Sequence, residues 1–365
     1  MKISNVASIV NTKIDASILT AHTYISTECM LPNCGGIENC SSIPNVKVTS
    51  FDKNDILLSN IRPYFKKLWF STRSGGCSND VICLRITNGE CLPKYLYYAL
   101  CTDEFIDTFS ASSKGTKMPR GDKNALLTYE IPDRNIEDQL HIVDILGSID
   151  NSIENNQSIM SNLIRLGKQI LQKAYNEQRC VNRCLGDCLC LLKDGTHNPP
   201  TRVEKGIPLI TGQTIDNGFI VYDKMTYIKE SDYKKIHKKY APAKNDLIIT
   251  KIGTLGKVAV LRGQDIPIAL HCNSALLRFS ELSPAVAFFV LISDEFQNEF
   301  HQKKNRTVQE FINLEQISNL DFLYPELLPD EIKLFTDLLN RVSLLEQENL
   351  KKIELKQLYL KKFFG

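Results

Sequence analysis

The tetrapeptide Asn198-Pro199-Pro200-Thr201 is the part of the sequence that most suggests chemistry. An Asn-Pro-Pro-aromatic sequence can hold the exocyclic amine of a flipped base for methyl transfer, while its ring stacks on that base. Here the fourth residue is Thr201, which has no ring, and no strand with a glycine-rich cofactor loop precedes the stretch. A catalytic DNA amino-methyltransferase that uses residues 198–201 therefore stays only as an alternative interpretation.

A second stretch, Gly253-Thr254-Leu255-Gly256-Lys257, contains the residue types of a phosphate-binding loop. Its spacing differs from G-x-x-x-x-G-K-[ST], and Val258 replaces the hydroxyl that would bind magnesium. We interpret the stretch as a tight turn between strands. Its exposed amides, together with Lys251 and Lys257, could still contact a phosphate backbone.

The remaining chemistry-bearing residues form no recognisable catalytic or metal site. The cysteines at 180, 184, 188 and 190 are close in sequence, but their spacing matches no paired C-x-x-C zinc pattern. The histidines are scattered, and they are His22, His141, His197, His237, His271 and His301. We predict no catalytic residue, no metal and no cofactor bound by the chain itself.

Length and charge limit the kind of protein this can be. A chain of 365 residues is expected to form more than one domain. Its net charge is only +2, so a nucleic acid would have to be held by local basic patches. No apolar run is long enough to span a membrane, and the N-terminus does not resemble a signal peptide. We expect a cytoplasmic location and, with it, reduced thiols.

The sequence contains an internal repeat. Lys53-Asn54-Asp55 recurs 191 residues later as Lys244-Asn245-Asp246, and each is followed by a β-rich apolar run. Asp103-Glu104-Phe105 recurs with the same offset at residues 294–296. Pro132 and Pro325, which are 193 residues apart, each precede a long helical pattern. Several matches in the same order indicate a duplication.

Two long helices are predicted, at about 137–178 and 330–364. In the first, Ile142, Ile149, Leu163 and Ile170 form one set of a heptad seam, and Ile145, Ile159 and Leu166 form the other. In the second, Phe335, Leu338, Val342 and Phe363 occupy the matching positions. Asn156 and Asn349 also match, as polar residues that can fix the register. A parallel or antiparallel intramolecular pair is expected, and an exposed helix or a dimer is the alternative.

Short β-branched runs and short helices fill the rest of the chain, so each half is a mixed α and β globule followed by a long helix. Basic residues gather in the loops of both halves. Residues 112–123 and 301–306 occupy equivalent places in the repeat, and residues 234–246 add a third cluster that contains Tyr240. Such loops suit contact with DNA phosphates and grooves, although a basic run can also be a solvated surface.

Taken together, these segments resemble the specificity subunits of type I restriction–modification systems. The openings of two target recognition domains are similar to YISTECMLPNCGGI (24–37) and LKDGTHNPPTRVEKGIPLITGQTIDNGFI (192–220). The central helical region is similar to IPDRNIEDQLHIVDILGSIDNSIENNQ (131–157). NDLIITKIGTLGKVAVL (245–261) and HCNSALLRF (271–279) fit as well. The start of the second helix, LPDEIKLF (328–335), departs from the family pattern because it lacks the Gln.

The resemblance implies a chain without catalysis of its own. It implies two domains that each read half of a bipartite double-stranded DNA target. It also implies helices that set the spacer and dock two methyltransferase subunits, which bind S-adenosylmethionine; restriction or motor subunits can join. The expected fold is α+β, with a pseudo-twofold internal repeat of two α/β target recognition domains separated by two long antiparallel helices that form a coiled-coil pair. The expected boundaries are 1–135 and 180–327 for the recognition domains, and 136–179 and 328–365 for the helices.

Candidate DNA contacts are basic and polar residues of the predicted loops, since Arg and Asn read bases well and Lys mostly neutralises phosphate. In the first domain they are Asn60, Arg62, Lys66, Lys114, Lys117 and Arg120. In the second domain they are Thr196, His197, Lys251, Thr254, Lys257, Lys303, Lys304 and Arg306. Cofactor binding by the isolated chain would favour the methyltransferase alternative. A purely structural coiled-coil scaffold, the other alternative, predicts no DNA binding even with methyltransferase subunits present.

Overall fold

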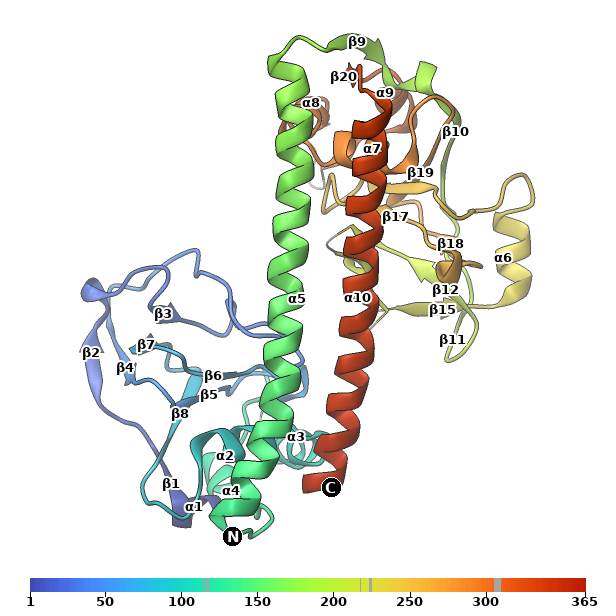
Figure 1. Ribbon diagram of the computed structural model, residues 1–365. Coiled ribbons are helices and arrows are strands. Elements are labelled where there is room, and N and C mark those ends of the chain that lie inside the picture. Colours follow the sequence, from blue (N-terminus) through green and yellow to red (C-terminus); the bar gives the residue numbers. More distant parts are fainter. Residues whose placement is uncertain (114, 116–117, 217, 223–224, 305–309) are drawn as a thin grey trace. The chain divides into compact units, whose positions relative to one another are not determined.

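The computed structural model describes residues 1–113, 115, 118–216, 218–222, 225–304 and 310–365. The chain divides into two compact units. Unit 1 comprises Met1–Asn155 and Asn349–Gly365, and unit 2 comprises Asn156–Glu348. The two long helices are α5 (Ile136–Asn176) and α10 (Pro329–Phe364) (Figure 1). Each helix is divided between the two units, with one part in unit 1 and the other in unit 2.

Unit 1 contains two four-stranded sheets, in the orders β1-β8-β5-β6 and β2-β4-β7-β3. Short helices cover its hydrophobic core. The strands are β1 (Ala7–Ile9), β2 (Lys13–Asp15), β3 (Tyr24–Ile25), β4 (Lys47–Phe51), β5 (Ile56–Ser59), β6 (Leu68–Phe70), β7 (Gly75–Cys77) and β8 (Val81–Ile86). The helices are α1 (Ile3–Val6), η1 (Ala16–Ile18), η2 (Pro63–Phe65), α2 (Pro93–Leu100), α3 (Asp103–Ala111) and α4 (Lys123–Thr128).

Unit 2 contains a sheet of matching order, β10-β19-β16-β17, beside the sheets β11-β15-β12-β18, β13-β14 and β20-β9. The strands are β9 (Cys180–Cys184), β10 (Leu189–Asp194), β11 (Arg202–Val203), β12 (Ile207–Ile210), β13 (Ile215–Asp216), β14 (Phe219–Ile220), β15 (Thr226–Ile228), β16 (Leu247–Thr250), β17 (Val258–Val260), β18 (Ala269–Leu270), β19 (Ser274–Phe279) and β20 (Asp321–Pro325). The helices are η3 (Leu185–Cys188), η4 (Gly212–Thr214), α6 (Glu230–Ile236), η5 (Gly263–Asp265), α7 (Pro284–Leu291), α8 (Asp294–Gln302) and α9 (Leu314–Ser318).

The first repeat match, Lys53-Asn54-Asp55 with Lys244-Asn245-Asp246, has the same structure in both units. Asn54 and Asn245 both have left-handed backbones, with φ of 75° and 73°. The buried carboxylate that follows each one binds an arginine on the neighbouring strand: Asp55 pairs with Arg85 and Asp246 with Arg278. Buried carboxylates are expected to be paired in this way. The predicted duplication therefore extends to the ion pair that fixes the strand ends.

The second repeat match, Asp103-Glu104-Phe105 with residues 294–296, forms the start of an equivalent helix in each unit. Thr102 caps α3 by accepting a hydrogen bond from the backbone N–H of Phe105, and Ser293 caps α8 by accepting one from Phe296. Both helices then bury a stacked pair of phenylalanines, Phe105 with Phe109 and Phe296 with Phe300. The preceding helices, α2 and α7, both begin with proline, which suits the first helical position.

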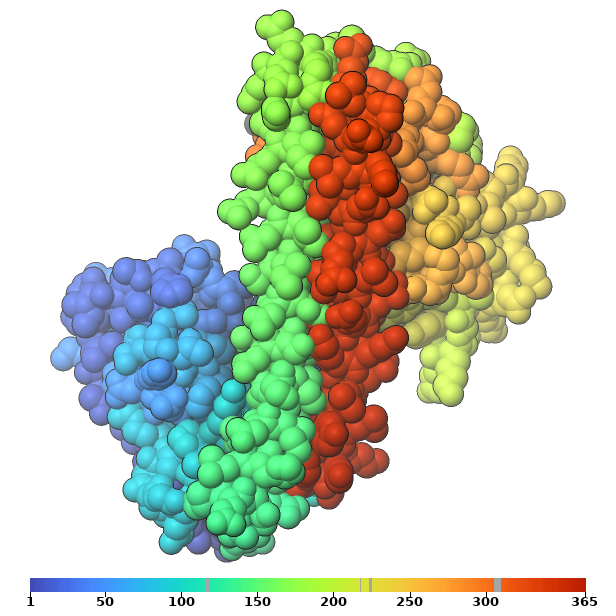
Figure 2. Space-filling model, in the orientation of Figure 1, coloured from blue at the N-terminus to red at the C-terminus, as the bar shows by residue number. Residues whose placement is uncertain are grey.

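The long helices form an antiparallel pair. Along α5 the residue number rises while that of its partner on α10 falls: Asp150 accepts from Lys356 at 2.6 Å, and Asn156 donates to Glu348 at 3.2 Å. Figures 1 and 2 show the two helices side by side, α5 in green and α10 in red. The expected α+β fold with two β-rich parts and two paired long helices is confirmed.

The predicted seam of α5 is correct in part: Leu163 and Ile170 of the first set and Ile145 of the second are half-buried. Ile142 and Ile149 are buried, as is the predicted polar residue Asn156. Ile159 and Leu166 are exposed, with 44% and 42% of their surface accessible. The residue after each faces inward instead, since Leu146, Met160 and Gly167 are buried where Ile145, Ile159 and Leu166 were expected. One reason is that a straight α-helix of 3.6 residues per turn drifts from a strict seven-residue repeat. Another is that parts of α5 pack against the rest of each unit and not only against α10.

On α10, Phe335, Leu338 and Val342 are buried as predicted, and Phe363 is half-buried. Asn349 is also buried, and its amide donates to the backbone oxygen of Ile153 at 3.5 Å. The two matched asparagines thus both lie inside the helix pair. Each is held by a group on the opposite helix, as expected of polar residues that fix a register.

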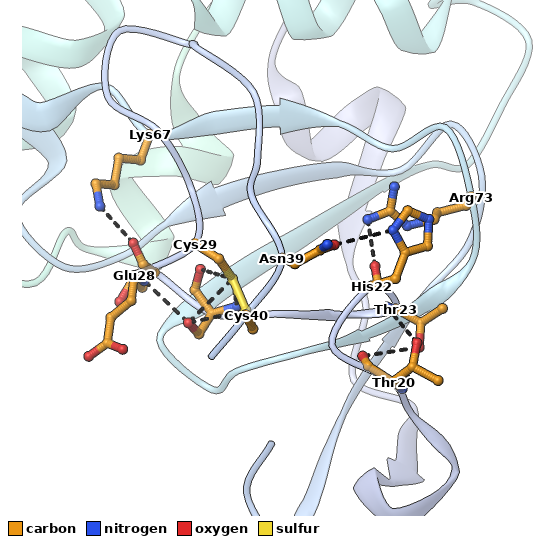
Figure 3. Close-up of a disulfide and its surroundings, with 11 residues drawn as sticks. Thr20, His22, Thr23, Glu28, Cys29, Asn39, Cys40, Lys67 and Arg73 are labelled. Carbon is orange, nitrogen blue, oxygen red and sulfur yellow. Dashed lines mark hydrogen bonds between the residues drawn. A yellow bond between two sulfur atoms is a disulfide. The ribbon is translucent and has the colours of Figure 1, made fainter. Parts of the chain in front are cut away.

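The expectation of reduced thiols is wrong for one pair of cysteines. Cys29 and Cys40 form a disulfide within the loop between β3 and β4 (Figure 3), with Cα atoms 5.3 Å apart. The loop folds back on itself, which brings together two cysteines that are 11 residues apart in sequence. The side chains of Lys67 and Arg73 donate to backbone oxygens of Thr27 and His22 in the same region. The other ten cysteines are free, including the four at 180–190.

Candidate nucleic-acid interface

One backbone arrangement recurs at the end of a central strand in both units; we call it the strand-end corner. In unit 1 it comprises residues 60–62, 80 and 119–121. Asn60, which follows β5, donates its N–H to the backbone oxygen of Asp80 at 2.8 Å and accepts from the N–H of Gly121 at 3.2 Å. Arg62 donates its N–H to the oxygen of Pro119 at 2.9 Å.

In unit 2 the strand-end corner comprises residues 251–253, 273 and 310–312. Lys251, which follows β16, donates to the backbone oxygen of Asn273 at 2.8 Å and accepts from Ile312 at 2.9 Å. Gly253 donates to the oxygen of Glu310 at 3.1 Å. Arg62 and Gly253 both have positive φ, 49° and 78°. The two corners therefore share their backbone bonds but carry different side chains.

The corner of unit 1 brings three predicted residues together. Asn60 is 8% exposed, and its side-chain oxygen has no hydrogen-bond partner among the residues that the structure describes. Arg62 is exposed, and Ile61 forms a bridge with Arg120. The exposed guanidinium of Arg120 donates to Asp80 at 2.9 Å. Exposed ion pairs are weak, so a phosphate or a guanine could replace Asp80 at little cost.

Lys66 lies apart from this group. It is buried, and its ammonium pairs with Asp103 of α3 at 2.7 Å. The pair fastens the turn η2 to the helical part of unit 1, so Lys66 serves the fold in this structure. Lys114 and Lys117, the other two residues predicted in the first domain, lie outside the described residues.

Beside the strand-end corner of unit 2 lies Asp194, the last residue of β10. Lys251 is only 4% exposed, and its ammonium lies 3.4 Å from the Asp194 carboxylate. His197, which is exposed, places a ring nitrogen 3.0 Å from the same carboxylate. Thr196 bridges to His271, and its hydroxyl donates to the backbone oxygen of Asn198 at 2.8 Å. Two of the predicted residues, Lys251 and His197, thus converge on one acid.

The remaining predicted residues of unit 2 surround the turn after β16. Thr254 is exposed at the tip of the turn. The Lys257 ammonium donates to the oxygen of Ile215 at 3.1 Å beside a pocket of about 210 Å³. Lys303 is exposed at the end of α8, and Lys304 pairs with Glu310 at 2.8 Å. Arg306 lies outside the described residues.

The Asn-Pro-Pro-Thr stretch forms part of an exposed loop between β10 and β11. The backbone N–H of Thr201 donates to Asp232 at 2.9 Å, which ties the loop to α6. Four lysines of the cluster 234–246 are exposed beside this loop, namely Lys234, Lys235, Lys238 and Lys239. Figure 2 shows α6 in yellow on the surface of unit 2. Among the described residues no group of His, Cys, Asp or Glu could hold a metal ion.

Two rings, the buried His237 and the half-buried Tyr240, lie between α6 and Asp194. Burial raises the pKa of Tyr240 to about 12, and the nearby Asp194 adds to this effect; the Tyr240 hydroxyl donates to the backbone oxygen of Asp194. Burial lowers the pKa of His237 to about 4, so this ring is neutral at pH 7. The charge of the neighbouring basic surface therefore comes from its exposed lysines and not from His237.

Sequence reasoning missed the acids that organise the corners. Asp80 and Asp194 each bind basic side chains that were predicted, but both stand at ordinary turn positions in the sequence. A weak signal for Asp194 was the Asp-Gly pair it forms with Gly195, which is typical of a turn. No pattern indicated that Lys251, a cation next to an apolar strand, would be buried against an acid.

Comparisons with known proteins agree on one family. Residues 11–163 match the protein-family model described as type I restriction modification DNA specificity domain. The type I restriction enzyme MjaVIII specificity subunit of Methanocaldococcus jannaschii is 22% identical over 345 residues, which cover 86% of this chain and 78% of that protein. In the part of the chain that the structure describes, no helix is long and apolar enough to cross a membrane.

Two solved structures align with the whole chain. The crystal structure of a type I restriction–modification system S subunit from M. genitalium has a TM-score of 0.57 at 16% identity and covers 100% of this chain and 95% of its own. This likeness shows a shared fold. The HsdS subunit from Thermoanaerobacter tengcongensis covers the same shares at 15% identity, but its TM-score of 0.38 carries no argument.

Proposed function

Because this chain belongs to the family of type I restriction–modification specificity subunits, which have no catalysis of their own, we propose that its two halves each read one half of a bipartite DNA target. The recognition domains are assigned to 1–135 and 180–327, and the spacer helices to 136–179 and 328–365. The alternative of an amino-methyltransferase that uses residues 198–201 is excluded by membership of this non-catalytic family.

The observation that carries the proposal is the pair of strand-end corners. Both present side chains from the same backbone arrangement, but the side chains differ: Arg62 and Arg120 in one unit, Gly253 and Phe311 at the matching places in the other. Two readers that share a scaffold and differ in contacting groups would recognise two different half-sites.

We assign the predicted residues to two roles. Arg62, Arg120 and Asn60 are proposed to contact base edges, because guanidinium and amide groups can bond two atoms of one base. His197, Thr196 and Thr254 are proposed for the same role in the other half-site. The lysines are proposed to contact phosphate, and they are Lys66, Lys114, Lys117, Lys251, Lys257, Lys303 and Lys304, together with Arg306. For Lys251, this requires DNA to compete with Asp194, whereas Lys66 would use a second N–H of its ammonium and keep its pair with Asp103.

The helices are proposed to dock two methyltransferase subunits, which bind S-adenosylmethionine, and restriction or motor subunits can join that complex. Supporting this, the helices expose apolar side chains that the pair itself does not cover, namely Ile159, Leu166, Leu344, Leu355 and Leu358. Exposed apolar groups of this number commonly mark a protein interface. Because the proposed partner is DNA, we propose a cytoplasmic location.

Methylome sequencing of cells that express the chain with its methyltransferase subunit tests the proposal. The expected result is methylation at a single bipartite motif, two short defined sequences separated by a spacer of fixed length. A contiguous motif would overturn the two-reader proposal. A chain without the methyltransferase subunit should give no methylation, which controls for the absence of catalysis.

A change in helix length should change the spacer. One added heptad in α5, with a matching heptad opposite it in α10, lengthens the pair by roughly 10 Å, which is about three base pairs. The half-sites should stay the same while the methylated spacer grows by about that number. The same methylome measurement reads the result. An unchanged spacer would refute the idea that the helices act as a ruler.

A further inference from the structure

Two large aromatic side chains stand exposed on a rigid turn of unit 1. Tyr64 is 54% exposed and Phe65 is 41% exposed, and their ring centroids lie 4.8 Å apart. They occupy η2, directly after Arg62 of the strand-end corner. Neither residue was predicted as a site residue. An adjacent pair of exposed aromatic rings is uncommon on a protein surface and calls for a partner.

The turn is held firmly by backbone bonds. Phe65 donates its N–H to the oxygen of Arg62 at 3.0 Å, and the oxygen of Phe65 accepts from the N–H of Asn33 at 3.0 Å. Lys66 has a left-handed backbone with φ of 54°, and its oxygen accepts from Cys34 at 2.8 Å. The Lys66–Asp103 ion pair fastens the base of the turn. The rings are therefore presented at a fixed place, with little backbone entropy left to lose on binding.

Cations flank the rings. Arg62 is exposed on the preceding residue, and the exposed Arg120 lies across the corner from it. Two acids of this region are already engaged, Asp80 with Arg120 and Asp103 with Lys66. An apolar tip beside arginines suits a nucleic acid, which has negative phosphates and stacked bases with apolar faces. It suits a purely apolar protein surface less well. Apolar side chains inserted between base pairs by DNA-bending proteins have this chemistry.

The described turn 253–256 of unit 2 has no such tip. At the matching turn after β16, the residues between Gly253 and Gly256 are Thr254 and Leu255. Thr254 is exposed, but Leu255 is half-buried and packs on the core of unit 2. Any insertion between bases would therefore concern one half-site only.

We propose that Tyr64 and Phe65 insert as an aromatic wedge at one base step of the half-site read by the first domain. The inference rests on the proposed function. The wedge unstacks that step, and the energy needed to unstack it depends on the two base pairs, being lowest at pyrimidine–purine steps. The first domain thereby reads part of its half-site through the deformability of the DNA, in addition to contacts from Arg62 and Arg120.

The test uses the complex of the full chain with its methyltransferase subunits and a duplex that carries the methylated target. A 2-aminopurine probe is placed at each position of both half-sites in turn, except at the base that becomes methylated, because base flipping there also raises fluorescence. Binding should raise the fluorescence severalfold at one position of the first domain's half-site and at no position of the other.

The variant Tyr64→Ala/Phe65→Ala should lose this rise and bind the target about 10- to 100-fold more weakly, since base stacking on an aromatic side chain contributes strongly to affinity. Tyr64→Phe/Phe65→Tyr should keep both, which separates stacking from folding. Lys53→Ala, at an exposed position in the turn before β5 with no proposed contact to DNA, should change neither. Because both rings are exposed, the alanine variant should still assemble with the methyltransferase subunits in size-exclusion chromatography.

Two results would overturn the wedge. If the unaltered complex binds its bipartite target but no probe brightens, the step is not opened, and the wedge fails while the proposed function stands. If the alanine variant loses the methyltransferase subunits instead of the fluorescence rise, the rings form a protein interface. Failure of the unaltered complex to bind bipartite DNA at all would contradict the proposed function itself.

Discussion

Replacing Arg62 and Arg120 together with alanine is expected to weaken target binding by about 2–6 kcal/mol, because a good bidentate contact to a base contributes about 1–3 kcal/mol. This corresponds to a loss of affinity between roughly 30-fold and roughly 10⁴-fold. Only the half-site of the first domain should become degenerate in methylome sequencing. Folding should change little, since Arg62 is exposed and the Arg120–Asp80 pair is largely exposed too.

Lys53 supplies the control for this experiment. It is exposed in the turn before β5, whereas Asn60 follows the same strand, so Lys53→Ala removes one positive charge at the opposite strand end. Its binding should stay near that of the unaltered chain, while Arg62→Ala alone should already be weaker. Equal losses in the two single variants would mean that net charge, and not the corner, determines binding. The slope of affinity against salt separates lost phosphate contacts from lost base contacts.

A methyl group at Gly167 is expected to destabilise unit 2 by about 1–3 kcal/mol, the usual cost of overpacking a core. A Cβ atom at this place in α5 would lie 2.1 Å from a ring carbon of Phe289 on α7. Phe289 is fully buried and lies against Phe288 and Phe335, so its ring has no room to withdraw. Urea unfolding of Gly167→Ala, followed by circular dichroism, measures the loss.

Gly147, the other glycine of α5, gives the matched comparison. Its Cβ would meet nothing closer than the Lys94 ammonium at 3.4 Å, which is ordinary contact. Gly147→Ala should therefore stabilise the chain by up to about 1 kcal/mol, because glycine is a poor helix former. If Gly167→Ala were also stabilising, helix propensity would outweigh the packing of Phe289. Smaller side chains at 289, as in Phe289→Leu, should reduce the cost of Gly167→Ala.

Much of the scaffold could be predicted because it follows from periodic patterns and from the repeat. The long helices, the buried Asn156 and Asn349, and the duplicated strand ends all have local signals in the sequence. The second set of the α5 heptad seam could not be predicted in this way. Ile159 and Leu166 are as apolar as Met160, and Gly167 has no side chain to suggest burial; only the packing of Phe289 against α5 selects it.

The candidate interface was predictable in its residue types but not in its geometry. Exposed Arg62 and buried Lys66 are both cations of one short loop, and only the tertiary partner Asp103 distinguishes them. Lys251 looked like a surface lysine, yet it lies against Asp194 from a distant strand. Tyr64 and Phe65 were passed over because aromatic residues are normally expected in a core.

The strand-end corners are held together by bonds between main-chain atoms, which residues other than proline can form whatever their side chain. Mutations at positions 62, 120 and 254 should thus be nearly neutral for folding while they alter what is bound. Natural variation could explore new target sequences there one substitution at a time, without first acquiring compensating changes elsewhere. A lineage that must recognise new DNA could diversify at these places, and its architecture would persist unchanged.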